Sequence, residues 1–129
     1  MRKGLLKMQK FDDNALEWHF EEEYRCKIER EQLAEGSFRV VFKGVIDAEP
    51  FKNKEMVFKK YKQSSIVTMQ TYGDDEQKSV RKAVQIHALA KNITVNFWAE
   101  LKNRNILRYS SRLVYGDCFF CHISGRRVF

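Results

Sequence analysis

Residues 24–46, which read YRCKIEREQLAEGSFRVVFKGVI, decide how the fold is predicted from this sequence. Apolar residues occupy alternate positions on both sides of the centre of this stretch: Tyr24, Cys26 and Ile28 before it, and Phe38, Val40 and Phe42 after it. Such alternation predicts a strand with one buried face. Between the two runs, Glu35-Gly36-Ser37 is predicted as a turn in which Gly36 supplies the backbone freedom for a tight reversal. The stretch is therefore predicted to form two antiparallel strands.

A third strand is predicted over residues 55–61, EMVFKKY, because the segment is rich in strand formers. Its alternation places Val57, Lys59 and Tyr61 on one face, so a lysine shares a face with apolar residues. Weaker patterns favour a short strand at residues 66–69 and one or two strands within residues 106–115.

A long amphipathic helix is predicted from about residue 76 to about residue 101. Asp74 and Gln77 form a capping-box pattern at its start. Apolar or weakly polar residues then recur at spacings of three and four: Val80, Ala83, Val84, His87, Ala90, Ile93, Phe97 and Leu101. The predicted fold class is α+β, with a twisted antiparallel sheet packed on one long helix. Residues 1–17 show no clear period and are interpreted as an upstream flank.

Composition restricts the class of protein. The chain has 129 residues, 43% of them hydrophobic, with one Pro and six Gly, which excludes a disordered linker and indicates one domain or part of one. Three cysteines are too few for a disulfide scaffold and favour a reducing compartment, so we expect a cytoplasmic protein without a membrane partner. The net charge of +7 is compatible with a nucleic acid, an anionic surface or a phosphorylated ligand.

The order of these elements has a chemical meaning. A polyphosphate needs backbone amides that approach closely, which a glycine turn permits, and a cation held by a rigid strand. The hairpin at residues 32–42 and the strand at residues 56–61 resemble those of the alpha-kinases, the atypical protein kinases that include elongation factor 2 kinase and the myosin heavy chain kinases. The segment from Ala90-Lys91 to Phe97 is similar to a helix of that family.

The resemblance implies a protein-kinase-like small lobe over residues 18–115 that binds ATP with Mg²⁺ and belongs to a protein serine/threonine kinase. It implies that Gly36, Ser37 and Arg39 contact the nucleotide and that Lys59, as the catalytic lysine, pairs with the α- or β-phosphate. Lys59 is preferred to Lys60 because it is the first of the two bases and shares a face with Val57 and Tyr61.

The C-terminal lobe of that family, with its catalytic aspartate and zinc ligands, has no counterpart here. Residues 116–129 are therefore interpreted as an unrelated tail, and the 129-residue chain is expected to bind ATP weakly and to transfer no phosphate. Cys118, Cys121 and His122 match a haem-attachment pattern and most of a zinc site, although reduced cysteines are the favoured interpretation. His87 is interpreted as a core or boundary histidine.

Two other functions remain open from the sequence. A basic α+β module that binds RNA or another polyanion would use the positive charge, although nucleic acid is the less favoured partner. A catalytically inactive lobe that serves as an interaction domain would bind a protein partner independently of Lys59. The protein substrate of a kinase cannot be derived from these residues.

Overall fold

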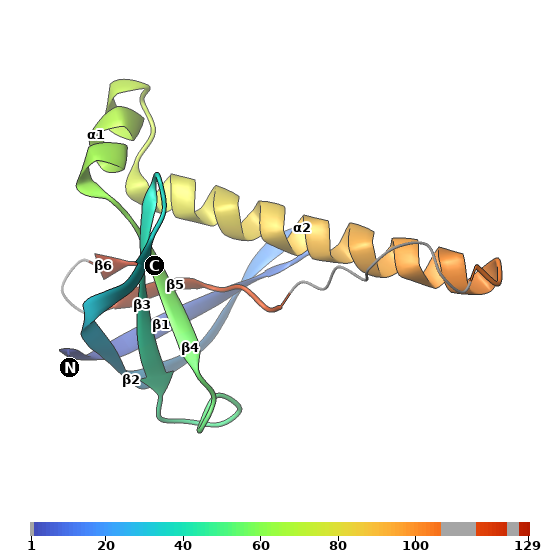
Figure 1. Cartoon of the computed structure of the whole chain (residues 1–129), viewed down its shortest axis with the longest axis horizontal. Coiled ribbons are helices and arrows are strands. Elements are labelled where there is room, and N and C mark those ends of the chain that lie inside the picture. Colours follow the sequence, from blue (N-terminus) through green and yellow to red (C-terminus); the bar gives the residue numbers. More distant parts are fainter. Residues whose placement is uncertain (1, 107–115, 124–126) are drawn as a thin grey trace.

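The structure, a computed structural model, describes residues 2–106, 116–123 and 127–129. These residues form an α+β fold with a six-stranded antiparallel sheet and two helices, which confirms the predicted class but adds a helix and three strands (Figure 1). The elements are β1 (Arg2–Asp12), β2 (Glu17–Glu35), β3 (Arg39–Ile46), β4 (Met56–Tyr61), α1 (Gln63–Thr71), α2 (Glu76–Asn103), β5 (Phe120–Ile123) and β6 (Arg127–Val128).

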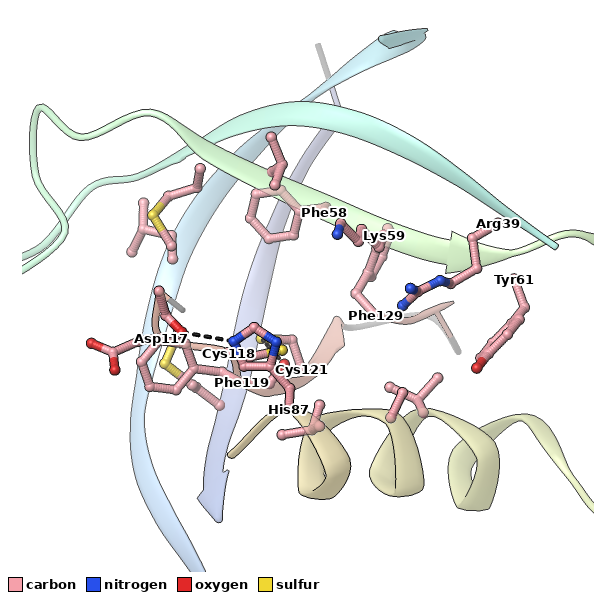
Figure 2. A pocket seen from close by; sticks show the side chains of 18 residues that line it. Arg39, Phe58, Lys59, Tyr61, His87, Asp117, Cys118, Phe119, Cys121 and Phe129 are labelled. Carbon is pink, nitrogen blue, oxygen red and sulfur yellow. Dashed lines mark hydrogen bonds between the residues drawn. The ribbon is translucent and has the colours of Figure 1, made fainter. Parts of the chain in front are cut away.

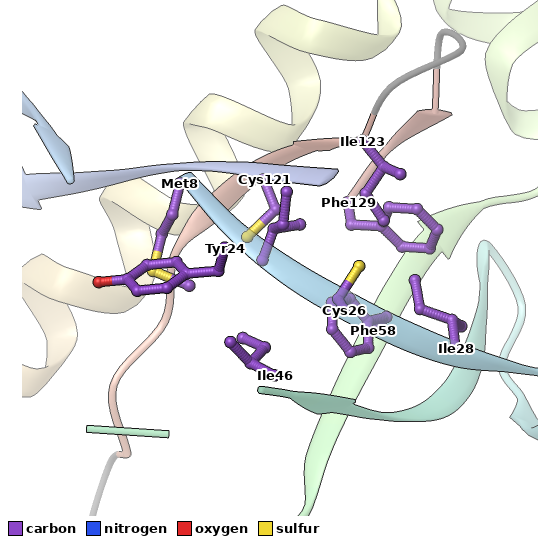
Figure 3. Close-up of a cluster of buried hydrophobic side chains, with 10 residues drawn as sticks. Met8, Tyr24, Cys26, Ile28, Ile46, Phe58, Cys121, Ile123 and Phe129 are labelled. Carbon is purple, nitrogen blue, oxygen red and sulfur yellow. The ribbon is translucent and has the colours of Figure 1, made fainter. Parts of the chain in front are cut away.

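The sheet has the strand order β4-β3-β2-β1-β5-β6 and curls around its main core. The curvature brings the two outer strands, β4 and β6, near each other. The Phe58 ring on β4 and the Phe129 ring directly after β6 pack edge to face, with centroids 5.7 Å apart. Between them lie the inward-facing side chains of the other strands (Figure 3). The core is completed by Leu6, Met8, Tyr24, Cys26, Ile28, Ile46, Cys121 and Ile123.

Residues 1–17 are not a flank, because β1 lies in the middle of the sheet between β2 and β5. Leu6 and Met8 are 0% and 1% exposed, among the most deeply buried side chains of the described residues. The alternation is hard to see in the sequence because the pairing with β2 shifts register between Lys7 and Gln9. Phe11, three residues after Met8, is buried beyond this irregularity, which breaks the period of two.

Residues 116–129 are not a separate tail either. β5 pairs with β1, and β6 pairs with β5, so this segment supplies two strands to the sheet. Phe129 continues the pairing, since its backbone N–H and C=O both bond to Cys121 at 2.9 Å. The tail interpretation rested on the absence of a family motif, whereas burial of Phe120, Cys121 and Ile123 makes these residues part of the fold.

The long helix is confirmed, with small differences at its start. The N-cap is Asp75 and not Asp74, because the Asp75 side chain accepts a hydrogen bond of 2.8 Å from the Lys78 amide. The expected strand at residues 66–69 is wrong, since this segment lies within α1. Ser65 explains part of the difference, because its hydroxyl donates a 3.0 Å hydrogen bond to the carbonyl of Phe38 and holds α1 against the hairpin. The strands expected within residues 106–115 lie almost wholly outside the described residues.

The hairpin and the third strand are confirmed as β2, β3 and β4, with the turn at Gly36 and Ser37. Gly36 has no left-handed backbone angle, however, and its amide donates to the Arg39 carbonyl at 2.8 Å. Its conformational freedom is therefore not what makes the turn. The glycine that the packing requires is Gly44, where an added Cβ would lie 2.5 Å from the Phe58 ring and 2.8 Å from the Lys27 carbonyl oxygen.

Within the described residues, neither helix combines the length and the apolar character that a membrane crossing needs.

Candidate functional site

A cavity of about 270 Å³ opens between β4 and α2 (Figure 2). Core side chains form its floor, among them Met8, Phe58 and Phe129, and α2 forms one wall with Val80 and Val84. The charged and aromatic polar residues among the described lining are Arg39, Lys59, Tyr61, His87 and Asp117, and two thiols, Cys118 and Cys121, line the cavity as well. The site is thus an apolar cavity with a few polar groups, which is the usual composition of a small-ligand pocket. Its volume is slightly below the usual range of about 300–1,000 Å³.

Arg39, predicted from the hairpin motif, and Lys59, predicted from the strand at residues 56–61, both line this cavity. They come from paired strands, because Arg39 is opposite Tyr61 and Val41 is opposite Lys59. Such diagonal neighbours on one face of a sheet lie roughly 7–8 Å apart. The Arg39 guanidinium also lies over the Tyr61 ring, 5.8 Å from its centroid. The paired strands β3 and β4 therefore present two cations side by side at one rim of the cavity.

Neither cation is neutralised by a carboxylate within ion-pair distance, as far as the described residues show. The residues that α2 contributes to the cavity are Val80, Ala83, Val84 and His87. The ion pair of a strand lysine with a helix glutamate, which active protein kinases require, is therefore not formed by these residues. A cation without a carboxylate partner beside a cavity is available to an anionic ligand.

Gly36 and Ser37 do not line the cavity. Both lie in the exposed turn that joins β2 to β3, beyond the position of Arg39. The structure thus brings together two of the four predicted site residues and leaves the other two at the tip of the hairpin.

The pKa of Cys118 shows that the two cations influence the wall of the cavity. Burial raises the pKa of the Cys118 thiol, and the positive charges of Lys59 and Arg39 oppose the shift. The two cations are therefore close enough to the wall of the cavity to favour a negative charge there. Deeper in the core, burial raises the pKa of Cys121 to about 12, so this thiol is not ionised near neutral pH.

Three residues that the sequence does not predict as site residues hold residues 116–117 against α2 at one end of the cavity. These are His87 and Lys91 on α2, and Asp117. His87 donates from Nε2 to the Gly116 carbonyl at 2.7 Å, and Lys91 donates to Asp117 at 2.5 Å. The hydrogen bond to Lys91 lowers the pKa of Asp117. A second cavity of about 210 Å³ adjoins the first and shares the wall from Gly116 to Cys118. The helical spacing of His87 and Lys91 is the available signal in the sequence, but their partners lie 29 and 26 residues away, respectively.

The donor set does not fit a resident Mg²⁺ ion, although the resemblance implies one. Asp117 has the one carboxylate side chain among the described lining residues, and its Oδ1 already accepts from Lys91. Mg²⁺ demands near-octahedral coordination by oxygen atoms. No group of three or more His, Cys, Asp or Glu side chains suited to a metal gathers in the part of the chain that the structure describes.

The segment Cys118–His122 does not gather its three candidate ligands. Cys118 packs against the small cluster of Val80, Val84 and Phe120, whereas Cys121 belongs to the main core. His122 lies beside the Phe120 ring, with centroids 6.4 Å apart. Alternate residues of this segment therefore face different clusters, as expected for extended backbone, and the cysteines pack as reduced core residues.

Comparison with known proteins gives no match to a family model, a curated protein or a solved structure. The relation to the alpha-kinases thus stays a prediction from the hairpin and the lysine strand. What can be argued further about function rests on the geometry of the cavity.

Proposed function

We propose that the chain is a nucleotide-binding lobe of the alpha-kinase type that holds ATP in the cavity between β4 and α2. One observation carries the proposal: Arg39 and Lys59, which the motif selects, line the same cavity and have no carboxylate partner among the described residues. The apolar floor suits a base or sugar, and the cationic rim suits phosphates. The small volume means that part of the nucleotide lies outside the cavity.

The same residues argue for binding without turnover by this chain. Phosphoryl transfer needs positioned metal ions and a residue that orients the nucleophile. Asp117 is already bonded to Lys91, and the residues described at the cavity supply no other carboxylate side chain. We therefore propose that phosphoryl transfer to protein serine or threonine, with Mg²⁺, requires groups beyond those around this cavity. The cytoplasmic location stays a prediction.

The decisive experiment is calorimetric titration of the 129-residue chain with ATP, comparing Lys59→Met with Lys60→Met. The two lysines are adjacent, but their charges act in different places. The charge of Lys59 opposes the burial that raises the pKa of Cys118 at the cavity. The charge of Lys60 opposes the burial that raises the pKa of Glu76, a different group. Loss of a charge-assisted contact costs roughly 1.5–3 kcal/mol, so we expect Lys59→Met to weaken ATP binding about 10- to 100-fold. Lys60→Met is expected to leave the affinity within about twofold.

The rival functions give different results in the same titration. A polyanion-binding module would bind RNA in a strongly salt-dependent way and respond alike to both lysine variants. Equal affinities of wild type, Lys59→Met and Lys60→Met for ATP would contradict the proposal. Phosphate transfer to a generic acceptor protein by the isolated chain would contradict the assignment of binding without turnover.

The alkylation rate of Cys118 provides a second, independent test of ATP binding at this cavity. An anionic ligand at Lys59 and Arg39 neutralises the charges that hold down the pKa of Cys118. We expect saturating ATP to slow alkylation of Cys118 at mildly alkaline pH, both by raising its pKa and by covering it. Mass spectrometry of the labelled chain measures the rate at each cysteine. Unchanged Cys118 labelling in the presence of bound ATP would place the nucleotide elsewhere.

A further inference from the structure

The helix α2 has a second apolar face that the sheet does not cover. The sequence predicts one apolar stripe along this helix, but of its members only Val80 and Val84 are buried. Ile86, Leu89, Ile93 and Phe97 are 67%, 41%, 68% and 44% exposed. We call these four residues the outer stripe. At 100° per residue they lie within an arc of roughly 80°, turned by roughly 150° from Val80 and Val84.

Figure 1 shows that α2 extends well past the described strands, so among the described residues much of its second half is not covered by the sheet. The helix makes its contacts with β1, β5 and β6 through its other face. Four large apolar residues aligned on one exposed helix face exceed what scattered surface residues explain and indicate an interaction site. The remaining question is which partner this face fits.

The spacing of the outer stripe is nearly symmetric about Lys91. Leu89 and Ile93 stand two residues to either side, and Ile86 and Phe97 stand five and six residues away. In an antiparallel pair of identical helices, a residue before the centre meets a residue equally far after it. Two copies of α2 packed in this way place Leu89 against Ile93 and Ile86 against Phe97, twice over.

Charge favours the antiparallel arrangement over the parallel one. Lys82 and Glu100 lie nine residues before and after Lys91, in line with the outer stripe and beyond its two ends. Antiparallel pairing sets each Lys82 opposite Glu100 of the second copy, whereas parallel pairing sets like charges together. Both side chains sit at the helix surface, where Lys82 contacts Asp74 at 3.5 Å and Glu100 contacts Arg104 at 2.8 Å.

We propose that the outer stripe is a self-association surface, through which two copies of this chain form an antiparallel two-helix seam centred near Lys91. The seam uses the face of α2 opposite Val80 and Val84, so it leaves the cavity between β4 and α2 open. One helix pair is a small interface, below the usual lower limit of about 1,200 Å², so the affinity is expected in the micromolar range or weaker.

Sedimentation equilibrium over a wide range of protein concentration tests the proposal. The wild-type chain is expected to dimerise, and Ile93→Glu is expected to raise the dissociation constant at least about tenfold by placing a charge in the seam. Val67→Glu is the matched control, since Val67 is an aliphatic residue, 52% exposed, on α1. Because both positions are exposed, circular dichroism should show unchanged folding. A wild-type chain that stays monomeric throughout, or equal dimerisation of both variants, overturns the proposal.

The register has its own test. Lys82→Glu and Glu100→Lys each create like charges across an antiparallel seam and should each weaken dimerisation roughly two- to fivefold. The double variant Lys82→Glu/Glu100→Lys restores opposite charges and should recover the wild-type dissociation constant. Single variants that dimerise as well as the wild type would overturn the antiparallel register. Loss of ATP binding in Lys59→Met would leave all of these results unchanged, so the two proposals fail separately.

Discussion

The middle of the sheet and the tip of the β2–β3 hairpin are built in opposite ways. In the middle, β1 and β5 lie side by side and bury Leu6, Met8, Cys121 and Ile123. At the tip, Leu33 and Phe38 are 52% and 69% exposed. The middle therefore holds the fold together, whereas the tip is free to change or to meet a ligand without loss of the core.

The middle is also the region that joins distant parts of the chain. Met8 pairs with Cys121 across more than a hundred residues, whereas the tip is closed by a bond from Gly36 to Arg39. Distant pairing costs more loop-closure entropy, which only burial of apolar surface offsets. The stability of this fold is thus expected to depend most on the two segments that are furthest apart in the sequence.

The largest effect is expected from removing β5 and β6. Deletion of residues 117–129 uncovers one edge of β1 and removes Cys121, Ile123 and Phe129 from the core. We expect the shortened chain to lose its cooperative unfolding transition, as followed by circular dichroism during heating. Insertion of Gly-Ser-Gly after Ser37, at the tip, is the control and should keep the transition. A cooperative transition in the deletion variant would show that β1 to β4 suffice for the fold.

A matched pair of leucines compares the two regions directly. Leu6 is 0% exposed on β1, and Leu33 is 52% exposed near the tip. Leu6→Ala should lower the free energy of unfolding by about 2–5 kcal/mol, because it removes buried methyl groups and leaves a cavity. Leu33→Ala should lower it by less than about 0.5 kcal/mol. Urea denaturation measures both values, and similar losses at the two positions would contradict the contrast.

Two glycines of the hairpin give a smaller and sharper contrast. Gly44→Ala forces the new methyl group against the Phe58 ring and the Lys27 carbonyl and should cost about 1–3 kcal/mol. Gly36→Ala meets no atom closer than 3.8 Å and should change the free energy of unfolding by less than about 1 kcal/mol, with either sign. A large loss at Gly36 would restore the view that the turn depends on glycine.

The sequence predicted those elements whose period is unbroken, namely the hairpin, β4 and α2. It failed where a second constraint interrupted the pattern. The register shift after Lys7 hides the period of β1, and β5 has only four residues, too few to establish an alternation. Arg39 and Lys59, which the motif selects, line one cavity, whereas the place of Asp117 depends on contacts that only the folded chain creates.

The outer stripe shows a further limit of prediction from periodicity. The spacing of Ile93 and Phe97 predicts that both are buried, which is wrong, because they are 68% and 44% exposed. Periodicity reveals that a face is apolar and says nothing about what covers it.

The smallest effect on the free energy of unfolding is expected in the turn that joins β1 to β2. The side chain of Asp12 stabilises this turn. Asp12 Oδ1 accepts hydrogen bonds from the amides of Asn14 and Ala15 at 2.9 and 3.0 Å. These bonds, with a smaller contribution from His19, lower the pKa of Asp12 below its ordinary value of 3.8. A carboxyl whose pKa is lowered by folding stabilises the fold above the unfolded value, and the contribution disappears as pH falls through the folded pKa.

Asp12→Asn isolates this contribution, because the amide oxygen can still accept both hydrogen bonds but carries no charge. We expect the wild type to be slightly more stable than Asp12→Asn well above pH 3.8 and equal to it well below that value. Urea denaturation of both proteins across this range measures the difference, and titration of the other carboxyls cancels in the comparison. The β2–β3 turn, closed by the backbone bond from Gly36 to Arg39, should show no such dependence when Ser37 is replaced by Ala. A difference that grows toward acid would reverse the assigned sign and assign the stabilisation to the neutral form of Asp12.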